Sequence, residues 1–140
     1  MAMKNNTKKQ LVILGLMLTF GVISSVSAEC VRPVASGYKK IGCLQDGLAS
    51  VLKDGKYGFI DKDGAVVIRP QYDFVSGFKE GLSHAKKGSK KGYIDTQGKE
   101  VIPFEYDFAN DFENGIAKVS KDDKWFYIDK TGKFVKDVGK

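Results

Sequence analysis

The sequence of 140 residues holds one histidine, three prolines and two cysteines. A single histidine excludes a multi-histidine metal site within one chain, and it excludes chemistry that needs a histidine pair. The sequence also shows no glycine-rich phosphate loop, no zinc-ligand spacing and no acid pair on a recognisable glycosidase scaffold. We therefore predict no catalytic residue, no metal and no cofactor, and we expect a protein that is not an enzyme.

The main apolar run, from Leu11 to Ile23, is too short to cross a bilayer as a helix. It follows three lysines and precedes small residues that end at Ala28, which is typical of a signal peptide. We predict a cleaved signal peptide with a signal helix over residues 1–28, and an uncleaved membrane anchor is the alternative. The mature protein is then expected to be exported, periplasmic or extracellular, and to meet the membrane only through the signal segment before cleavage.

The positive charge is partly a property of that segment. Cleavage removes three lysines and no acid, so the formal charge falls from +6 to about +3. A nearly balanced domain of this kind disfavours a nucleic-acid binder.

Both cysteines, Cys30 and Cys43, remain in the exported part of the chain. Pairing is expected outside the reducing cytosol, and a loop of this length contributes on the order of 3 kcal/mol in the chain-entropy model. Free or intermolecular thiols are one alternative. Lipidation of Cys30 is another, although Glu29 is not the small residue that a lipoprotein signal needs.

One passage recurs every 34 residues, as KYGFIDKDG, KKGYIDTQG and KWFYIDKTG. A period of 34 also belongs to helical tetratricopeptide repeats, so the period alone does not decide the architecture. The residues decide it, because alternating β-branched and aromatic residues with several glycines per unit predict strands, and no apolar stripe has helical spacing.

An aspartate begins a turn in each unit and a glycine closes it three residues later. Aspartate accepts hydrogen bonds from backbone amides, and glycine adopts positive φ without steric cost. A calcium loop is the alternative at Asp61 and Asp63, but Gln97 and Thr131 at the equivalent positions are poor ligands. The predicted turn residues are Asp61, Gly64, Asp95, Gly98, Asp129 and Gly132.

The strand before the turn is expected to be covered on both faces, since neither set of alternate residues is polar. Gly58 and Gly92 then leave room for a close approach, and Phe126 fills the equivalent gap in the last unit. We expect Pro70 and Pro103 to end the return strand, because proline cannot donate to a ladder.

We predict an all-β fold of tandem 34-residue antiparallel hairpin repeats, with about three strands per unit in a meander that is solenoid-like or partly closed. One hairpin is marginal in water, so the units must share a core. Tyr38 lies 34 residues before Tyr72, so the register begins before the first full unit. The predicted boundaries are a disulfide-tethered leader at 29–44 and three repeats at 45–140, namely 45–78, 79–112 and 113–140.

The passages DGKYGFIDKDGAVVIRPQYD and DDKWFYIDKTGKFV, with FKEGLSHAKK and FENGIAKVSKDD between units, resemble the WG (KWG) repeats of bacterial secreted and envelope proteins. The likeness covers residues 45–135. It departs at the name-giving pair, which is Tyr57-Gly58, Lys91-Gly92 and Trp125-Phe126 here. The resemblance implies a β-rich repeat module and no common activity.

The second unit concentrates charge in HAKKGSKKG, so a basic hairpin tip is a candidate binding site. A solvated turn is the plainer interpretation. His84 is expected to be exposed at a variable position, with Ser83 on the opposite face of the strand. The candidate binding residues are Lys86, Lys87, Lys90, Lys91 and His84.

We expect a monomeric, exported, non-enzymatic interaction module that binds an unknown protein or an anionic envelope polymer. Rigid repeats with variable exposed positions suit recognition. The alternative is a lectin-like glycan binder of the cell envelope that uses exposed rings such as Tyr57, Trp125 and Tyr127.

Overall fold

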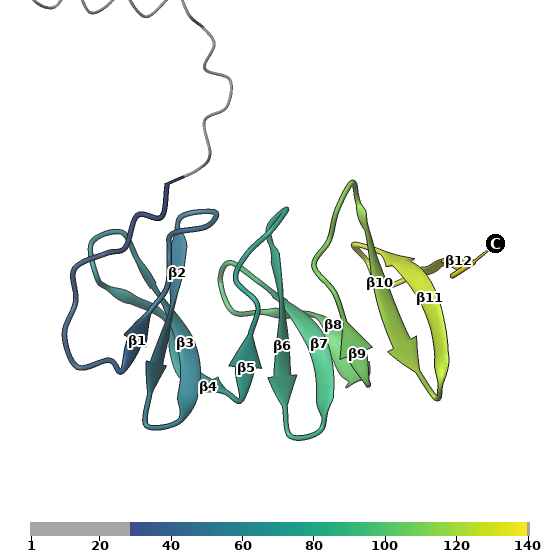
Figure 1. The fold of residues 1–140 in the computed structure, drawn as a ribbon, viewed down its shortest axis with the longest axis horizontal. Helices are drawn as coiled ribbons and strands as arrows, with labels where there is room; N and C mark the ends of the chain where they lie inside the picture. Colours follow the sequence, from purple (N-terminus) through teal and green to yellow (C-terminus); the bar gives the residue numbers. More distant parts are fainter. Residues whose placement is uncertain (1–28, 140) are drawn as a thin grey trace, which may run out of the picture.

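The computed structural model describes residues 29–139, and none of these residues is helical. The chain is all-β and forms three antiparallel sheets side by side in an open row (Figure 1). The predicted signal peptide over 1–28 lies outside the described residues. No helix in the described part is long and apolar enough to span a membrane.

Each sheet has four strands, and in each the spatial order follows the chain order. The first sheet contains β1 (Lys40–Ile41), β2 (Leu48–Lys53), β3 (Lys56–Asp61) and β4 (Val66–Tyr72). The second contains β5 (Phe74–Val75), β6 (Leu82–Lys87), β7 (Lys90–Asp95) and β8 (Glu100–Tyr106). The third contains β9 (Phe108–Ala109), β10 (Ile116–Lys121), β11 (Lys124–Asp129) and β12 (Phe134–Asp137).

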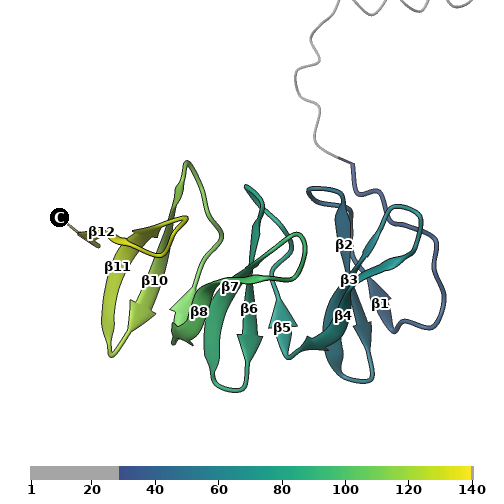
Figure 2. The same cartoon turned by 180° about the vertical axis from the view of Figure 1, so that it is seen from behind.

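The expectation of about three strands per unit is wrong, because each sheet has four. The predicted antiparallel hairpins are present, but they form three separate sheets that do not close on each other. The fourth strand comes from the link between units, because Phe74–Val75 pairs with Lys86 and Ala85 and so begins the next sheet. The chain passes from one sheet to the next between Tyr72 and Phe74, and Figure 2 shows the three sheets as distinct layers from behind.

The aspartate turns are confirmed. Asp61 Oδ1 accepts hydrogen bonds from the backbone N–H groups of Asp63 and Ala65, both at 2.9 Å. Gly64 closes the turn at φ +87° and donates its N–H to the Asp61 carbonyl. Asp95 and Asp129 make the same backbone contacts in the later units.

The prolines do not end the return strand, contrary to expectation. β4 continues through Pro70 to Tyr72, and β8 continues through Pro103 to Tyr106. The register shifts at this point: Tyr57 pairs with Tyr72, whereas Phe59 pairs with Ile68. Extra residues bulge out of the ladder there, so the missing N–H of proline removes no ladder hydrogen bond.

The predicted role of the strand glycines is confirmed, and the bulge explains it. A Cβ at Gly92 would lie 2.6 Å from the Ile102 carbonyl oxygen, and one at Gly58 would meet the backbone of Ile68 and Pro70. In the last unit Phe126 takes the place of the glycine. It pairs directly with Asp137 of β12, and the ladder has no bulge opposite it.

The hydrophobic core lies at the seams between successive units. The seam between the first two sheets joins residues from both, as does the seam between the second and third. The first of these clusters contains Leu48, Phe59, Ile68, Tyr72, Val75, Phe78, Ala85 and Ile94. The second contains Leu82, Tyr93, Ile102, Tyr106, Ala109, Phe112, Ala117, Val119 and Ile128.

The leader covers a third, smaller core in the first sheet, as a preceding unit would. Its residues Ala35 and Tyr38 pack against a core of Ala49, Val51 and Ile60. β1 pairs with β2 just as β5 pairs with β6, which confirms that the register starts before the first full unit. The Cys30–Cys43 disulfide, also predicted, fixes this segment.

Candidate interaction surface

A row of aromatic and lysine side chains runs across all three sheets on one face. Its members are 17 residues apart in the sequence and come from odd-numbered strands: Tyr57, Phe74, Lys91, Phe108 and Trp125. Two members of the row can lie in one sheet, on its first and third strands, and both then pair with the same residue of the strand between them. In the second sheet, Phe74 and Lys91 both pair with Lys86. We call these five residues the row.

Neighbouring members of the row are in contact. The ring centroids of Tyr57 and Phe74 are 6.3 Å apart, and those of Phe108 and Trp125 are 5.6 Å apart with nearly parallel planes. Lys91 Nζ lies 5.7 Å from the Phe74 centroid and 5.8 Å from that of Phe108. Such contacts between an ammonium and a ring are attractive, so the row is continuous.

The row is open to solvent. Phe74, Phe108 and Trp125 expose 40%, 56% and 41% of their surface, so all three belong to the exposed large apolar residues of the described chain. Adjacent exposed rings in a small domain mark a site of interaction more often than isolated ones.

The predicted basic tip is divided between two faces of its hairpin. Lys86 and Lys91 are cross-strand partners on the side of the row. Lys87 lies on the other side, over the rings of Tyr72 and Phe104. Lys90 is neutralised by Asp107, with Nζ to Oδ1 at 2.6 Å. The four lysines therefore do not converge on one site, and only two of them belong to the row's surface.

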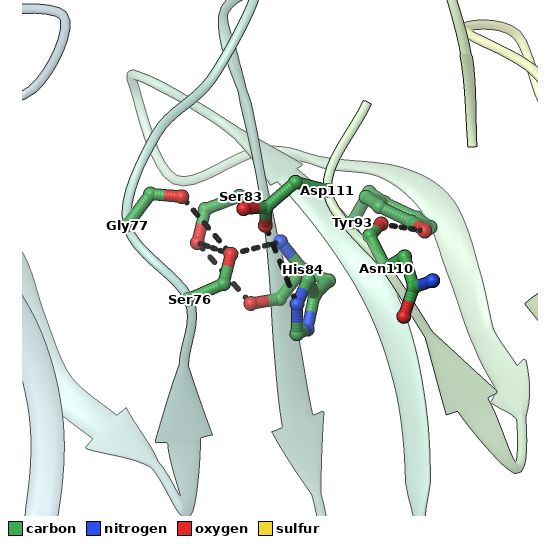
Figure 3. A network of polar contacts seen from close by, with 7 residues as sticks. All are labelled: Ser76, Gly77, Ser83, His84, Tyr93, Asn110 and Asp111. Atoms are coloured by element: carbon green, nitrogen blue, oxygen red, sulfur yellow. Dashed lines mark hydrogen bonds and ion pairs between the residues drawn. The ribbon is translucent and has the colours of Figure 1, made fainter. Parts of the chain in front are cut away.

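His84 is buried, so the prediction that it is exposed is wrong. It retains 9% of its surface, because Phe74 stacks on its ring and Tyr93 meets it edge-on. The carboxylate of Asp111, from the segment between β9 and β10 of the third sheet, points at the ring with Oδ1 3.4 Å from Nε2 (Figure 3). Phe74 and Tyr93 come from the neighbouring strands of the same sheet and Asp111 comes from the third sheet. The alternation of residues along β6 does not reveal this cover.

Burial lowers the pKa of His84 to about 4, and the Lys91 ammonium acts in the same direction, while Asp111 partly opposes them. The imidazole is therefore neutral near pH 7. Its Nδ1 is enclosed and has no hydrogen-bond partner among the described residues. Within residues 29–139, the ring of this histidine packs against aromatic side chains and has one polar contact, to Asp111.

The serines near His84 form hydrogen bonds with its backbone and not with its ring. Ser76 Oγ accepts a hydrogen bond from the His84 backbone N–H at 3.1 Å and lies 3.4 Å from Ser83 Oγ (Figure 3). Ser83 is fully buried and donates to the carbonyl of His84 at 3.2 Å. In the same region the Tyr93 hydroxyl donates to the carbonyl of Asn110 at 2.7 Å.

An open groove of about 400 Å³ lies beside the row in the second unit. One wall comes from β5 and the segment after it, the other from the link that follows β9. The lining residues are Phe74, Ser76, Lys79, His84, Asn110, Asp111 and Glu113.

The residues that distinguish the second unit gather at this place. His84 stands where the other units have Ser50 and Lys118, Asp111 where the first has Gly77, and Lys91 where they have Tyr57 and Trp125. The charges of both Asp111 and Lys91 act on His84, so the three lie together. Sequence reasoning missed Phe74, Phe108 and Asp111, although the 17-residue spacing of the row was a usable signal.

The family described as WG containing repeat matches residues 35–57, 57–90 and 92–125, which together cover more than half of the chain. The protein belongs to the WG-repeat family. The second and third matched segments each run from the third strand of one sheet into the next sheet, so the family's repeat crosses the boundary between sheets. Neither a curated protein nor a solved structure gives a significant match to this WG-repeat protein.

Among residues 29–139, no group of three or more histidine, cysteine, aspartate or glutamate side chains is placed to hold a metal ion. The aspartates of the repeats serve the turns instead, as Asp61 and Asp95 show with their bonds to backbone N–H groups.

Proposed function

We propose that this WG-repeat protein is an exported, non-enzymatic interaction module that binds a partner protein or another envelope component along the row. The open, solenoid-like succession of sheets acts as a rigid support, and the row and its groove form the contact surface. Rigid scaffolds with variable exposed positions are well suited to recognition.

The observation that carries this proposal is the row of contacting side chains, in which the rings of Phe74, Phe108 and Trp125 are exposed. Aromatic residues supply much of the binding energy at protein interfaces, because they bury a large area with few rotatable bonds. Tyr57, Phe74, Phe108 and Trp125 are already ordered by contact with one another, so little side-chain entropy is lost on binding.

The arrangement around His84 gives no support to a hydrolytic role. Ser83 and Ser76 bond to backbone atoms of His84, and Asp111 meets the ring at Nε2. A nucleophile would need its hydroxyl at an accepting ring nitrogen. The Cys30–Cys43 disulfide supports a site of action outside the reducing cytosol.

A lectin-like function is the second candidate, and the exposure of Trp125 is the observation in its favour. Sugar stacking requires an open ring face. One side of Trp125 is met by Phe108 and the ring is also approached by Lys118 Nζ at 5.0 Å from its centroid, while Tyr127 has Lys136 Nζ at 5.4 Å. The row therefore exposes the edges of its rings more than their faces. Such a surface suits binding of a protein better than stacking of a sugar.

The test is a pull-down with the oxidised mature protein from the envelope fraction of the source cells. The variant Phe108→Ser/Trp125→Ser removes two rings of the row, and Phe134→Ser, which removes an exposed ring outside it, is the matched control. The proposal predicts that captured partners disappear with the double variant only. Equal capture by wild type and double variant would refute it, and elution by neutral oligosaccharides would favour the lectin-like function.

A further inference from the structure

We infer that an aromatic side chain of a partner polypeptide takes the place of the Lys91 ammonium between Phe74 and Phe108, with carboxylates next to that ring in the partner's sequence. We call this position the slot. The inference rests on the proposed function and names the ligand of the same surface. The slot is the place in the row where Lys91 interrupts the succession of rings.

The repeats themselves show what fits this position. The residues equivalent to Lys91 are Tyr57 and Trp125. Trp125 stacks on Phe108 within its own sheet, and Tyr57 meets Phe74 of the following sheet. A ring above Lys91 would make both kinds of contact at once, with Phe74 in its own sheet and Phe108 in the next.

The Lys91 ammonium occupies the slot in the free protein. Its Nζ lies almost equally far from the two centroids, 5.7 Å from Phe74 and 5.8 Å from Phe108. A lysine side chain is flexible and its ammonium prefers water, so an incoming ring can displace it at little cost. The displaced ammonium then stands beside the ring, where it can bind an anion.

The charge at the middle of the row favours an acidic partner. Lys86 and Lys91 are directly opposed across β6 and β7, and like charges in that relation repel each other. Neither forms an ion pair among residues 29–139. Carboxylates flanking the inserted ring would relieve the repulsion, and the acids Asp111 and Glu113 of the protein itself line the adjacent groove.

Binding of short peptides to the oxidised mature protein tests the inference. The probe is the blocked heptapeptide Gly-Ser-Glu-Trp-Glu-Ser-Gly, compared with versions that carry lysine for both glutamates or alanine for tryptophan. Titrations followed by amide NMR shifts should show changes at Phe74, Lys91 and Phe108, and each altered peptide should bind at least about tenfold more weakly.

Two variants separate the slot from the general surface. Lys91→Tyr supplies the ring that the other units carry, so the fold should persist while peptide affinity falls about tenfold or more. Lys87→Tyr changes the same hairpin on its opposite side and should bind the peptide as the wild type does.

Several outcomes would overturn the inference. They are absence of peptide binding, equal binding by Lys91→Tyr, equal binding of the lysine peptide, or shifts at the slot caused by polygalacturonate but not by the peptides. If the peptides fail while the Phe108→Ser/Trp125→Ser variant still loses its captured partners, the slot is wrong and the proposed function stands. If that variant also captures normally, both fail.

Discussion

Gly92 passes so close to Ile102 that a Cβ at the glycine would lie 2.6 Å from the isoleucine's carbonyl oxygen. The new Cβ would meet main-chain atoms of β8, so no flexible side chain can move aside. We expect Gly92→Ala to lower the free energy of unfolding by about 2–3 kcal/mol, because β7 and β8 must separate. Urea denaturation followed by far-UV circular dichroism measures this.

The control is Gly88→Asn in the same hairpin. Gly88 has φ +67° and nothing within 4 Å of its virtual Cβ, and asparagine tolerates that conformation. This variant should stay within about 1 kcal/mol of the wild type. A loss as large as that of Gly92→Ala would show that close packing is not the reason for the glycine.

His84 should make stability depend on pH. Its pKa in the folded protein is about 4, below the ordinary value of 6.5, so the unfolded chain binds the proton more readily. The stabilisation is complete above pH 6.5, is lost between pH 6.5 and 4, and amounts to at most about 3 kcal/mol.

NMR titration can follow this ring without assignment, because it is the only histidine. His84→Ser, which copies Ser50 of the first unit, should flatten the stability profile between pH 4 and 6.5. A measured pKa near 6.5 in the folded protein would contradict the burial.

Glu80 links the second unit to the third. Its two carboxylate oxygens accept hydrogen bonds from the backbone N–H groups of Asn114 and Gly115, at 2.7 and 2.9 Å. The bond from Gly115 is the main cause that lowers the pKa of Glu80. Its contribution is therefore present above the ordinary pKa of a glutamate and is lost as the pH falls through the lowered value.

We expect Glu80→Gln to lower the urea midpoint at pH 7, and this difference from the wild type should shrink in acid. Glu105→Gln is the control, since Glu105 accepts from the Lys121 side chain and not from the next unit's backbone. Equal effects of the two variants at pH 7 would argue against a special link through Glu80.

The disulfide should stabilise the first unit above all. Reduction frees a leader that covers Ala49, Val51 and Ile60, and the loss is about 3 kcal/mol in the chain-entropy model. Hydrogen exchange should quicken in β2 and β3 more than in β10 and β11. Reductant should have no effect on Cys30→Ser/Cys43→Ser, and uniform loss of protection in the wild type would contradict a local cap.

Much of the fold could be predicted because it depends on interactions between residues that are close in the sequence. The bonds of Asp61 to its own turn, the positive φ of Gly64 and the alternation around Phe59 depend on neighbours in sequence. Continuation of β4 through Pro70 could not be predicted, since it depends on a bulge over the partner strand.

The site was harder to predict, for a related reason. Residues at the position of His84 vary between units, which is typical of an exposed site, yet Phe74 and Asp111 bury this one from the two adjoining links. The four lysines are close in sequence, but strand alternation sends Lys87 away from Lys91. Such relations arise when sheets pack on each other, and no single unit contains them.

The central claim is that the units fold only by sharing cores across their seams. Within the middle unit, Ala85 and Ile94 belong to the core shared with the first sheet, whereas Tyr93 and Ile102 belong to that shared with the third. Far-UV circular dichroism of a peptide spanning residues 79–112, beside the mature protein, tests this most directly. The peptide should be unfolded and show no cooperative transition, and a stable β spectrum with cooperative melting would contradict the account.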